Sequence, residues 1–242
     1  NETYTGIFDF LKAGIALTIR ITLTGYGIAI VLGLFTGLGR VSKNPIIYNL
    51  ATLYVQVMRG IPILVTILYV AFVVSPPAIG LINTLGGWLA GLHPLPADNV
   101  LVELTIRKVD FSIRGTIALA ISYGAFSAEI FRAGIESIGR GQMEAARSLG
   151  MSYVQAMRYI ILPQAVRRVM PPLGNDFIAM LKESSLVSVL GVRELTQLSK
   201  LYAATSFLYL QTYSLLAFMY LTMTILLSLG VKAMERRLST GD

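Results

Sequence analysis

The chain has 242 residues, of which 55% are hydrophobic and only 14% are charged. The apolar residues form runs too long for a soluble core, so we expect one membrane domain of five or six spans. The absence of cysteine excludes disulfides and cysteine-based metal or nucleophile chemistry. The net charge of +7 comes from cations between apolar runs, a placement that the positive-inside rule explains better than nucleic-acid binding does.

Residues 10–38 are predicted to form the first span. Lys12 and Arg20 are expected to extend toward the outer surface. The glycines of this segment predict a face that packs closely on another helix. They are Gly14, Gly25, Gly27, Gly33, Gly37 and Gly39.

Residues 46–74 are predicted to form the second span. An unbroken helix of this length would extend roughly 43 Å, more than the hydrocarbon core requires, so we expect a kink or tilt with a break near Gly60 and Pro62. Residues 75–112 then form a long Pro/Gly-rich outer loop. Its apolar part, 79–92, contains Trp88 and is predicted to be too broken to span and to lie at the outer interface. The only histidine, His93, is expected to be a surface residue and not a ligand, and no metal site is predicted.

Three further spans are predicted at 113–135, 171–189 and 207–231, within a single domain covering 1–242. The fourth is short and polar. The connections on the side of segment 139–165 and the C-terminus carry eleven lysines and arginines, and those on the opposite side carry about six. This difference places segment 139–165 and the C-terminus in the cytoplasm and, with five spans, the N-terminus outside. Because the chain starts at Asn1 and no signal peptide is visible, we expect a fragment or processed form of a longer polypeptide.

Segment 139–165 carries a spaced pattern. Glu144-Ala145-Ala146 is followed after three residues by Gly150, after nine more by Ile160, and then by Leu162-Pro163. Ala145 and Ala146 are predicted to give a helix a small-residue face, with Glu144 near its start and Gly150 ending it in a left-handed conformation. Pro163 is expected to break or kink the helix that follows. An ordinary interfacial helix with a chance Glu-Ala-Ala is the alternative.

This pattern resembles the EAA loop of ABC-importer permeases, the segment that docks onto the cytoplasmic ATPase. The resemblance implies an ATPase-coupling role for eight residues of this segment. They are Glu144, Ala145, Ala146, Arg147, Leu149, Gly150, Leu162 and Pro163.

Three other stretches extend the resemblance to the polar amino acid uptake family of ABC permeases, the histidine/glutamine/arginine type. They are Arg59–Val65 (RGIPILV, with Ile61 where threonine is common), Tyr123–Ile135 and Gly174–Leu186. The match covers nearly the whole chain from Leu11 to Leu238, and the long outer loop departs from the usual pattern. It implies an all-α transmembrane type I importer permease fold with five spans and a cytoplasmic EAA coupling helix.

The same resemblance implies partners and a location in the bacterial inner membrane. The partners are a second permease subunit in a homo- or heterodimer, two ABC ATPase subunits and an external substrate-binding protein or fused domain. The chain contains no G-x-x-x-x-G-K-[ST] loop, so ATP and Mg²⁺ are expected on the partner ATPases, with no cofactor and no catalytic residue in this chain.

Polar residues at membrane depth are the candidate substrate-binding residues. They are Asn175, Asp176, Ser184, Ser185, Lys182, Glu129, Tyr123 and Arg59. Asp176 is expected to pair with a substrate ammonium or cationic side chain, which together with Glu129 favours a basic amino acid. Structural alternatives are that Glu129 pairs with Arg132, that Asp176 pairs with Lys182 or with a partner's arginine, and that Arg59 satisfies backbone carbonyls at the helix break.

Two other function classes remain open at this level. A secondary transporter or channel without an ATPase predicts an inverted repeat or ion-relay carboxylates in several spans, and neither is evident. The second open class is a non-transporting scaffold that shares the permease fold. Recovery of an ATPase with the tagged chain distinguishes the importer from both.

Overall fold

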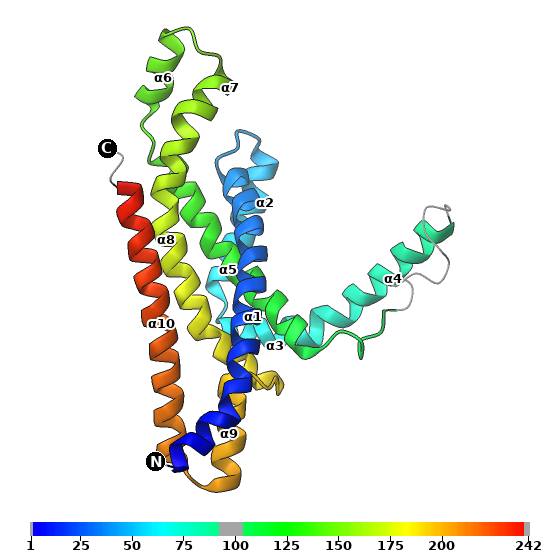
Figure 1. Cartoon of the computed structure of the whole chain (residues 1–242). Coiled ribbons are helices and arrows are strands. Elements are labelled where there is room, and N and C mark those ends of the chain that lie inside the picture. Colours follow the sequence, from blue (N-terminus) through cyan, green and yellow to red (C-terminus); the bar gives the residue numbers. More distant parts are fainter. Residues whose placement is uncertain (1, 92–103, 240–242) are drawn as a thin grey trace.

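The computed structural model is an elongated bundle of helices (Figure 1), and it describes residues 2–91 and 104–239. These residues contain no strand. The N-terminus lies at the end opposite to α6, and the C-terminal end of α10 lies toward the α6 end. The helical elements are α1 (Glu2–Arg40), α2 (Pro45–Gly60), α3 (Ile63–Tyr69), η1 (Val70–Val74), α4 (Ser75–Gly91), α5 (Phe111–Glu136), α6 (Arg140–Ser148), α7 (Tyr153–Ala156), η2 (Met157–Ile161), α8 (Leu162–Glu183), η3 (Ser184–Leu190), α9 (Leu195–Ser206) and α10 (Tyr209–Ser239).

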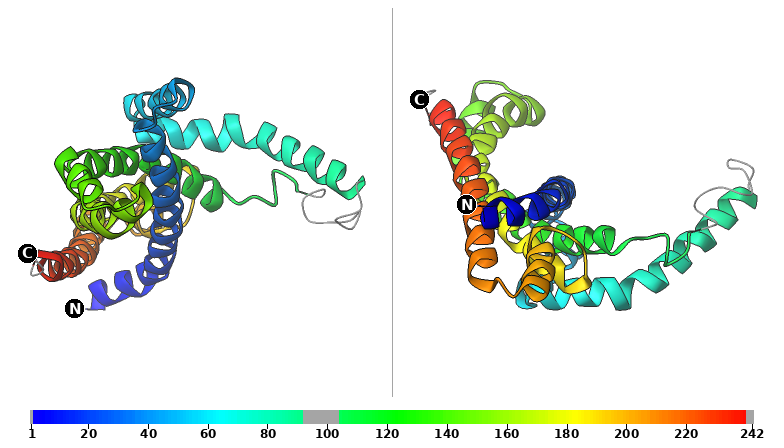
Figure 2. Two further views of the ribbon diagram at one scale, coloured as in Figure 1. Left: turned by 90° about the horizontal axis from the view of Figure 1, so that it is seen from above. Right: turned by 60° about the horizontal axis from the view of Figure 1, so that its bottom comes forward.

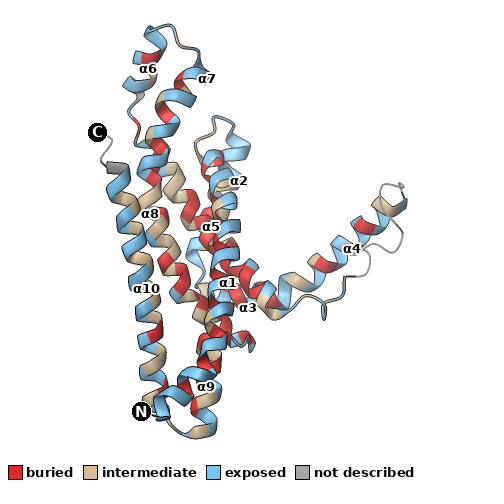
Figure 3. Cartoon of the chain, in the orientation of Figure 1, coloured by how far each residue is buried: buried red, intermediate tan, exposed pale blue. Residues whose placement is uncertain are grey.

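The core of the bundle is the contact between α1 and α5, onto which η1, α8 and η3 pack. Ile21 and Ala29 of α1 meet Leu119 of α5, Ile67 of α3 and Met180 of α8 in one buried cluster. α10 lies along α8 and contributes few buried residues (Figure 3). A helix that stays exposed on most of its apolar surface needs an apolar environment, which a bilayer provides.

Small residues allow α1 to approach α5 closely, as the glycine pattern predicts. A methyl group at Gly33 would lie 2.5 Å from the Cβ atom of Ser127 and 3.0 Å from the backbone nitrogen of Ala128. One at Gly37 would lie 2.9 Å from the carbonyl oxygen of Ala128. Gly27 is the exception to the prediction, because no atom lies within 4 Å of the same position there.

The break predicted in the second span is confirmed. α2 ends at Gly60, Ile61 has an extended backbone, and α3 begins after Pro62. The chain then stays helical to Gly91, so the prediction of a broken, Pro/Gly-rich loop from residue 75 is wrong for Ser75–Gly91. Pro76 and Pro77 are accommodated because the π-helical turn η1 comes just before them, and Ser75 Oγ donates to the Val70 carbonyl at 2.6 Å. Residues 92–103 of that loop, which include His93, lie outside the described residues.

The second correction concerns Pro163, which was predicted to break or kink its helix: the break is absent. α7, η2 and α8 follow one another without interruption from Tyr153 to Glu183. The π-helical turn η2 again comes just before the proline, and Gln164 Nε2 donates to the Ile160 carbonyl at 2.9 Å. The predicted short fourth span, 171–189, is therefore the second half of a longer helix followed by the 3-10 turn η3.

Three helical stretches of the described chain are long and apolar enough to cross a membrane. They are Glu2–Arg40, Ile63–Gly91 and Tyr209–Arg237. α5 and α8 have 26 and 22 residues, which meets the length that a span requires, but their hydropathy is lower. Both lie in the middle of the bundle (Figure 1).

The glycine contact gives the first testable prediction. Gly33→Ala should lower the free energy of unfolding by about 1–3 kcal/mol, because the added methyl group overpacks the α1–α5 contact. Gly27→Ala adds the same methyl group on the same helix where nothing is near, and it should leave stability unchanged or raise it by up to about 1 kcal/mol, because alanine favours the helix over glycine. Thermal unfolding of the two purified variants in one detergent measures the difference, and equal midpoints would contradict the close packing.

Candidate functional site

Four side chains of α5 and α8 form two hydrogen bonds in the interior of the bundle. Ser127 Oγ donates to Asp176 Oδ2 at 3.2 Å, and the Tyr123 hydroxyl donates to Glu183 Oε2 at 3.0 Å. Tyr123 and Ser127 are buried, whereas the two acidic residues are partly accessible. We call Tyr123, Ser127, Asp176 and Glu183 the interior polar cluster.

The spacing along each helix explains why these groups meet. Residues four apart or seven apart lie on one face of an α-helix. Tyr123 and Ser127 are four apart on α5, and Asp176 and Glu183 are seven apart on α8. Tyr26 of α1 closes one side, with its hydroxyl donating to the Leu173 carbonyl at 2.6 Å and its ring 5.2 Å from that of Phe177.

Neither acidic residue of the cluster has a cation within salt-bridge distance among the residues that the structure describes. Intramolecular pairing of Asp176 with Lys182, one of the alternatives, is therefore absent, and Lys182 is exposed. Two unpaired carboxyl groups beside hydroxyl donors can accept hydrogen bonds from an ammonium or guanidinium group.

A second polar cluster ties three helices together. Glu129 of α5 pairs with Arg40 of α1 and with Arg132 of α5, and its Oε2 atom lies 3.9 Å from Arg59 of α2. Arg132 also pairs with Glu136. We call Glu129, Arg40, Arg59, Arg132 and Glu136 the ion-pair cluster.

The structure thus separates the predicted substrate residues. Tyr123 and Asp176 come together in the interior polar cluster, whereas Glu129 and Arg59 belong to the ion-pair cluster. Pairing of Glu129 with Arg132, one of the alternatives, is confirmed. Asn175 and Lys182 are exposed, and Ser185 is partly buried.

Ser184 is buried, and its hydroxyl donates to the Leu181 carbonyl at 2.7 Å. A substrate carboxylate would therefore compete with the protein backbone for this donor. Ser127 and Glu183 belong to the interior polar cluster but were not among the predicted site residues. The seven-residue interval between Asp176 and Glu183 is a sequence signal that would have found Glu183.

Helix α6 and its C-terminal turn form the tip of the molecule, at the end that also holds α7 (Figure 1). Gly150 has φ +83°, as the prediction of a left-handed helix end requires. The amide of Gly150 donates to the Arg147 carbonyl at 3.0 Å, and that of Met151 donates to the Ala146 carbonyl at 3.2 Å, which is a Schellman motif. Ser152 and Gln155 then form a capping box that starts α7.

The predicted coupling residues do not all face outward. Glu144, Ala145, Arg147 and Leu149 are exposed, whereas Ala146 is 1% exposed. The predicted two-alanine docking face is therefore wrong for Ala146, because this side of α6 packs on its own subunit near a small core of Ile138, Ile161 and Ala165. Glu144 lies in the middle of α6 and not near its start. Leu162 and Pro163 are exposed on α8.

Comparison with known proteins identifies the family. The model of the binding-protein-dependent transport system inner membrane component matches residues 29–240. The chain belongs to this family. It is a permease component of an amino-acid ABC transporter, a membrane subunit and not itself an enzyme.

Relatives at similar length support this assignment. The chain is 36% identical over 231 residues to the probable glutamine ABC transporter permease protein GlnM of Bacillus subtilis, covering 96% of this chain and 94% of the relative. It is 32% identical over 228 residues to the glutamine transport system permease protein GlnP of Escherichia coli K12, with 94% and 92% covered. A crystal structure of an amino acid ABC transporter with histidines superposes with a TM-score of 0.78 at 34% identity, covering 97% of both chains.

The ion-pair cluster gives a prediction for this permease. Glu129→Gln should lower the thermal midpoint, because Arg40 and Arg132 lose a charged partner while staying partly buried. It should leave the ratio of the KM values for any two transported amino acids unchanged, because Glu129 already pairs with cations of the protein. Glu136→Gln removes only the exposed partner of Arg132 and serves as the control. A shifted KM ratio in Glu129→Gln would assign Glu129 to the substrate instead.

Proposed function

We propose that this permease forms the translocation pathway of an ATP-driven importer for polar, basic amino acids. It acts as a dimer with an identical or related permease subunit. Two ABC ATPases, which carry ATP and Mg²⁺, dock on the exposed side of α6, and an external substrate-binding protein or fused domain delivers the cargo. Binding and hydrolysis of ATP switch the dimer between outward-facing and inward-facing states.

The coupling role is supported by the helix-turn-helix that α6, the turn at Gly150 and α7 form at one end of the molecule. It holds Glu144, Ala145, Arg147 and Leu149 on an exposed surface at one end of the molecule. Leu149 is 83% exposed, so its apolar side chain is available to a partner surface. The uninterrupted segment from Tyr153 to Glu183 connects this tip to Asp176 and Glu183.

The proposed arrangement in the membrane has five crossings. They are formed by α1, by the broken pair α2–α3, by α5, by α8 and by α10. The tip and the C-terminus lie in the cytoplasm, and the N-terminus lies outside. The opposite placement of the N-terminus and α6 in the bundle and the excess of cations on the tip side support this orientation.

The preference for a basic amino acid follows from the interior polar cluster. Asp176 and Glu183 offer two carboxyl groups without a cation of their own among the described residues. An α-ammonium group needs one such acceptor, and a cationic side chain needs a second.

Purification provides the direct test of ATP-driven transport. The tagged permease, extracted in mild detergent, should be recovered with an ATPase subunit encoded beside it, and the pair should hydrolyse ATP faster in the presence of substrate and binding protein. Uptake that persists without any ATPase would favour a secondary transporter.

Asp176 provides the test of the substrate site. Asp176→Asn should lower arginine uptake about tenfold or more while affecting glutamine uptake less, because a charge-assisted hydrogen bond contributes about 1.5–3 kcal/mol. Lys182→Gln, an exposed change on the same helix, is the control. Transport assays in proteoliposomes measure both, and unchanged arginine uptake in Asp176→Asn would remove Asp176 from the site.

Gly150 provides the test of coupling. Gly150→Val should abolish ATP-driven uptake while leaving membrane insertion intact, because a β-branched residue at φ +83° distorts the end of α6 at a cost of about 1–2 kcal/mol or more. Gly150→Asn should retain much of the uptake, since asparagine tolerates this conformation. Equal and normal uptake by both variants would argue against the coupling role.

A further inference from the structure

An apolar arm projects sideways from the bundle, and both views of Figure 2 show it well separated from the other helices. We define the arm as α4 together with the return segment 104–110. The sequence contains no charged residue from Gly60 to Gly91, which includes the whole of α4.

The root of the arm is fixed by Arg114 of α5, which is 7% exposed. Its Nε atom donates to the Val109 carbonyl at 2.9 Å, and its Nη1 atom donates to the Ala71 carbonyl at 3.3 Å. Nη2 donates to the carbonyl of Ile106, and the guanidinium lies 4.6 Å from the centre of the Phe111 ring. One buried cation therefore binds the chain before the arm, at Ala71, and the return segment of the arm, at Ile106 and Val109, so the protein fixes how the arm leaves the bundle.

α4 has two opposite faces. Ile79, Asn83 and Gly86 share the face toward the return segment, where Asn83 Nδ2 donates to the Leu104 carbonyl at 2.7 Å. At about 100° per residue, the face pointing away from it carries Leu81, Leu85 and Trp88. These side chains are 62%, 51% and 63% exposed.

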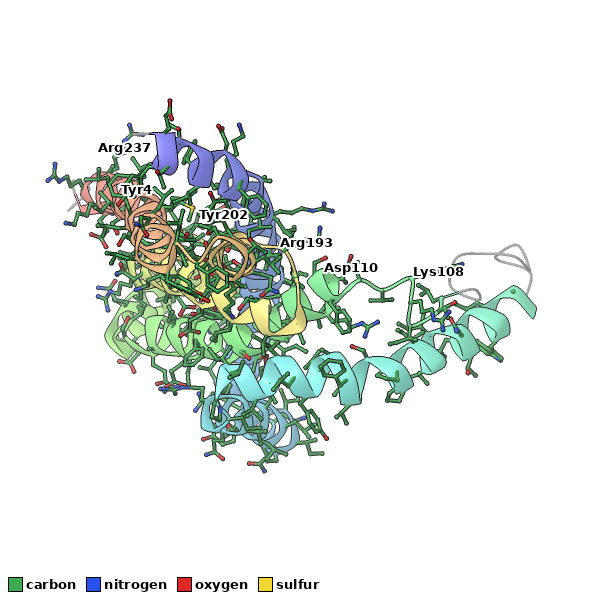
Figure 4. The ribbon with its side chains drawn as sticks, turned by 90° about the horizontal axis from the view of Figure 1, so that it is seen from below. Tyr4, Lys108, Asp110, Arg193, Tyr202 and Arg237 are labelled. Carbon is green, nitrogen blue, oxygen red and sulfur yellow. The ribbon has the colours of Figure 1, made fainter. Side chains whose placement is uncertain are left out.

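The charges of the arm lie on the return segment. Arg107, Lys108 and Asp110 are exposed there, and Figure 4 shows Lys108 and Asp110 on the segment beside α4. An uncharged helix with a tryptophan near its end and cations on the segment alongside match the two layers of a lipid interface, where apolar side chains meet acyl chains and cations meet phosphates. The central backbone groups of α4 pair inside the helix, as burial of that part in lipid requires.

We propose that the face formed by Leu81, Leu85 and Trp88 is covered by the acyl chains of membrane phospholipid, with Arg107 and Lys108 at the level of the phosphates. The arm is then a membrane-embedded anchor at the side of the permease. This role does not depend on the cargo or on the ATPase.

Trp88 makes the proposal directly measurable, because it is the only tryptophan in the chain. The full permease is reconstituted in vesicles of ordinary phosphatidylcholine and in vesicles whose acyl chains carry bromine near the glycerol. Bromine quenches tryptophan fluorescence only at short range. A Trp88→Phe variant, prepared in parallel, gives the signal of any copurified protein, and the difference between the two preparations is the emission of Trp88.

We expect the emission of Trp88 to be lost in brominated vesicles relative to ordinary vesicles and to resist quenching by iodide in the water. Quenching by iodide with no loss in brominated lipid would place the face in water and overturn the proposal. Protection from both quenchers would place it against another protein subunit and overturn the proposal equally.

Discussion

The arrangement of this permease depends on the close approach of α1 to α5 at Gly33 and Gly37. In a bilayer the lipid chains are as apolar as the side chains, so burial of apolar surface gives little drive for helices to associate. The stabilisation must therefore come from van der Waals contact between closely packed helices. A side chain at Gly33 or Gly37 would push α1 away from α5 and reduce this contact. The same contact brings Arg40 against Glu129 in the ion-pair cluster and Tyr26 against α8 beside the interior polar cluster.

Two π-helical turns, η1 and η2, each allow a helix to continue through a proline. Each comes shortly before a proline that cannot donate a backbone hydrogen bond, and at each a nearby side chain donates to a carbonyl of the turn. Ser75 does so for Val70 at the start of α4, and Gln164 does so for Ile160 at the start of α8. As a result, both segments stay helical where proline alone predicts a break, and α8 connects the tip with the middle of the bundle without a joint.

Much of the fold could be predicted from the sequence because apolar runs, glycine spacing and the break at Gly60 and Pro62 act locally. The family could be identified from motifs whose residues lie at fixed intervals. The left-handed conformation of Gly150 could be predicted because glycine commonly ends a helix in this way. The course of the chain at Pro76 and Pro163 could not be predicted, since it depends on the hydrogen-bond register of the preceding turn. The separation of Glu129 from Asp176 also required the structure, because it depends on where Arg40 and Arg59 arrive from helices distant in sequence. The burial of Ala146 also required the structure, because it depends on how α6 folds back toward Ile161 and Ala165.

The tip around α6 satisfies its own backbone hydrogen bonds. The Schellman motif at Gly150 pairs the last carbonyls of α6, and the capping box of Ser152 and Gln155 pairs the first amides of α7. This surface is therefore folded before any partner arrives. A protein docking on it would lose little conformational entropy in ordering the tip, so such an association would depend on the fit of two preformed surfaces.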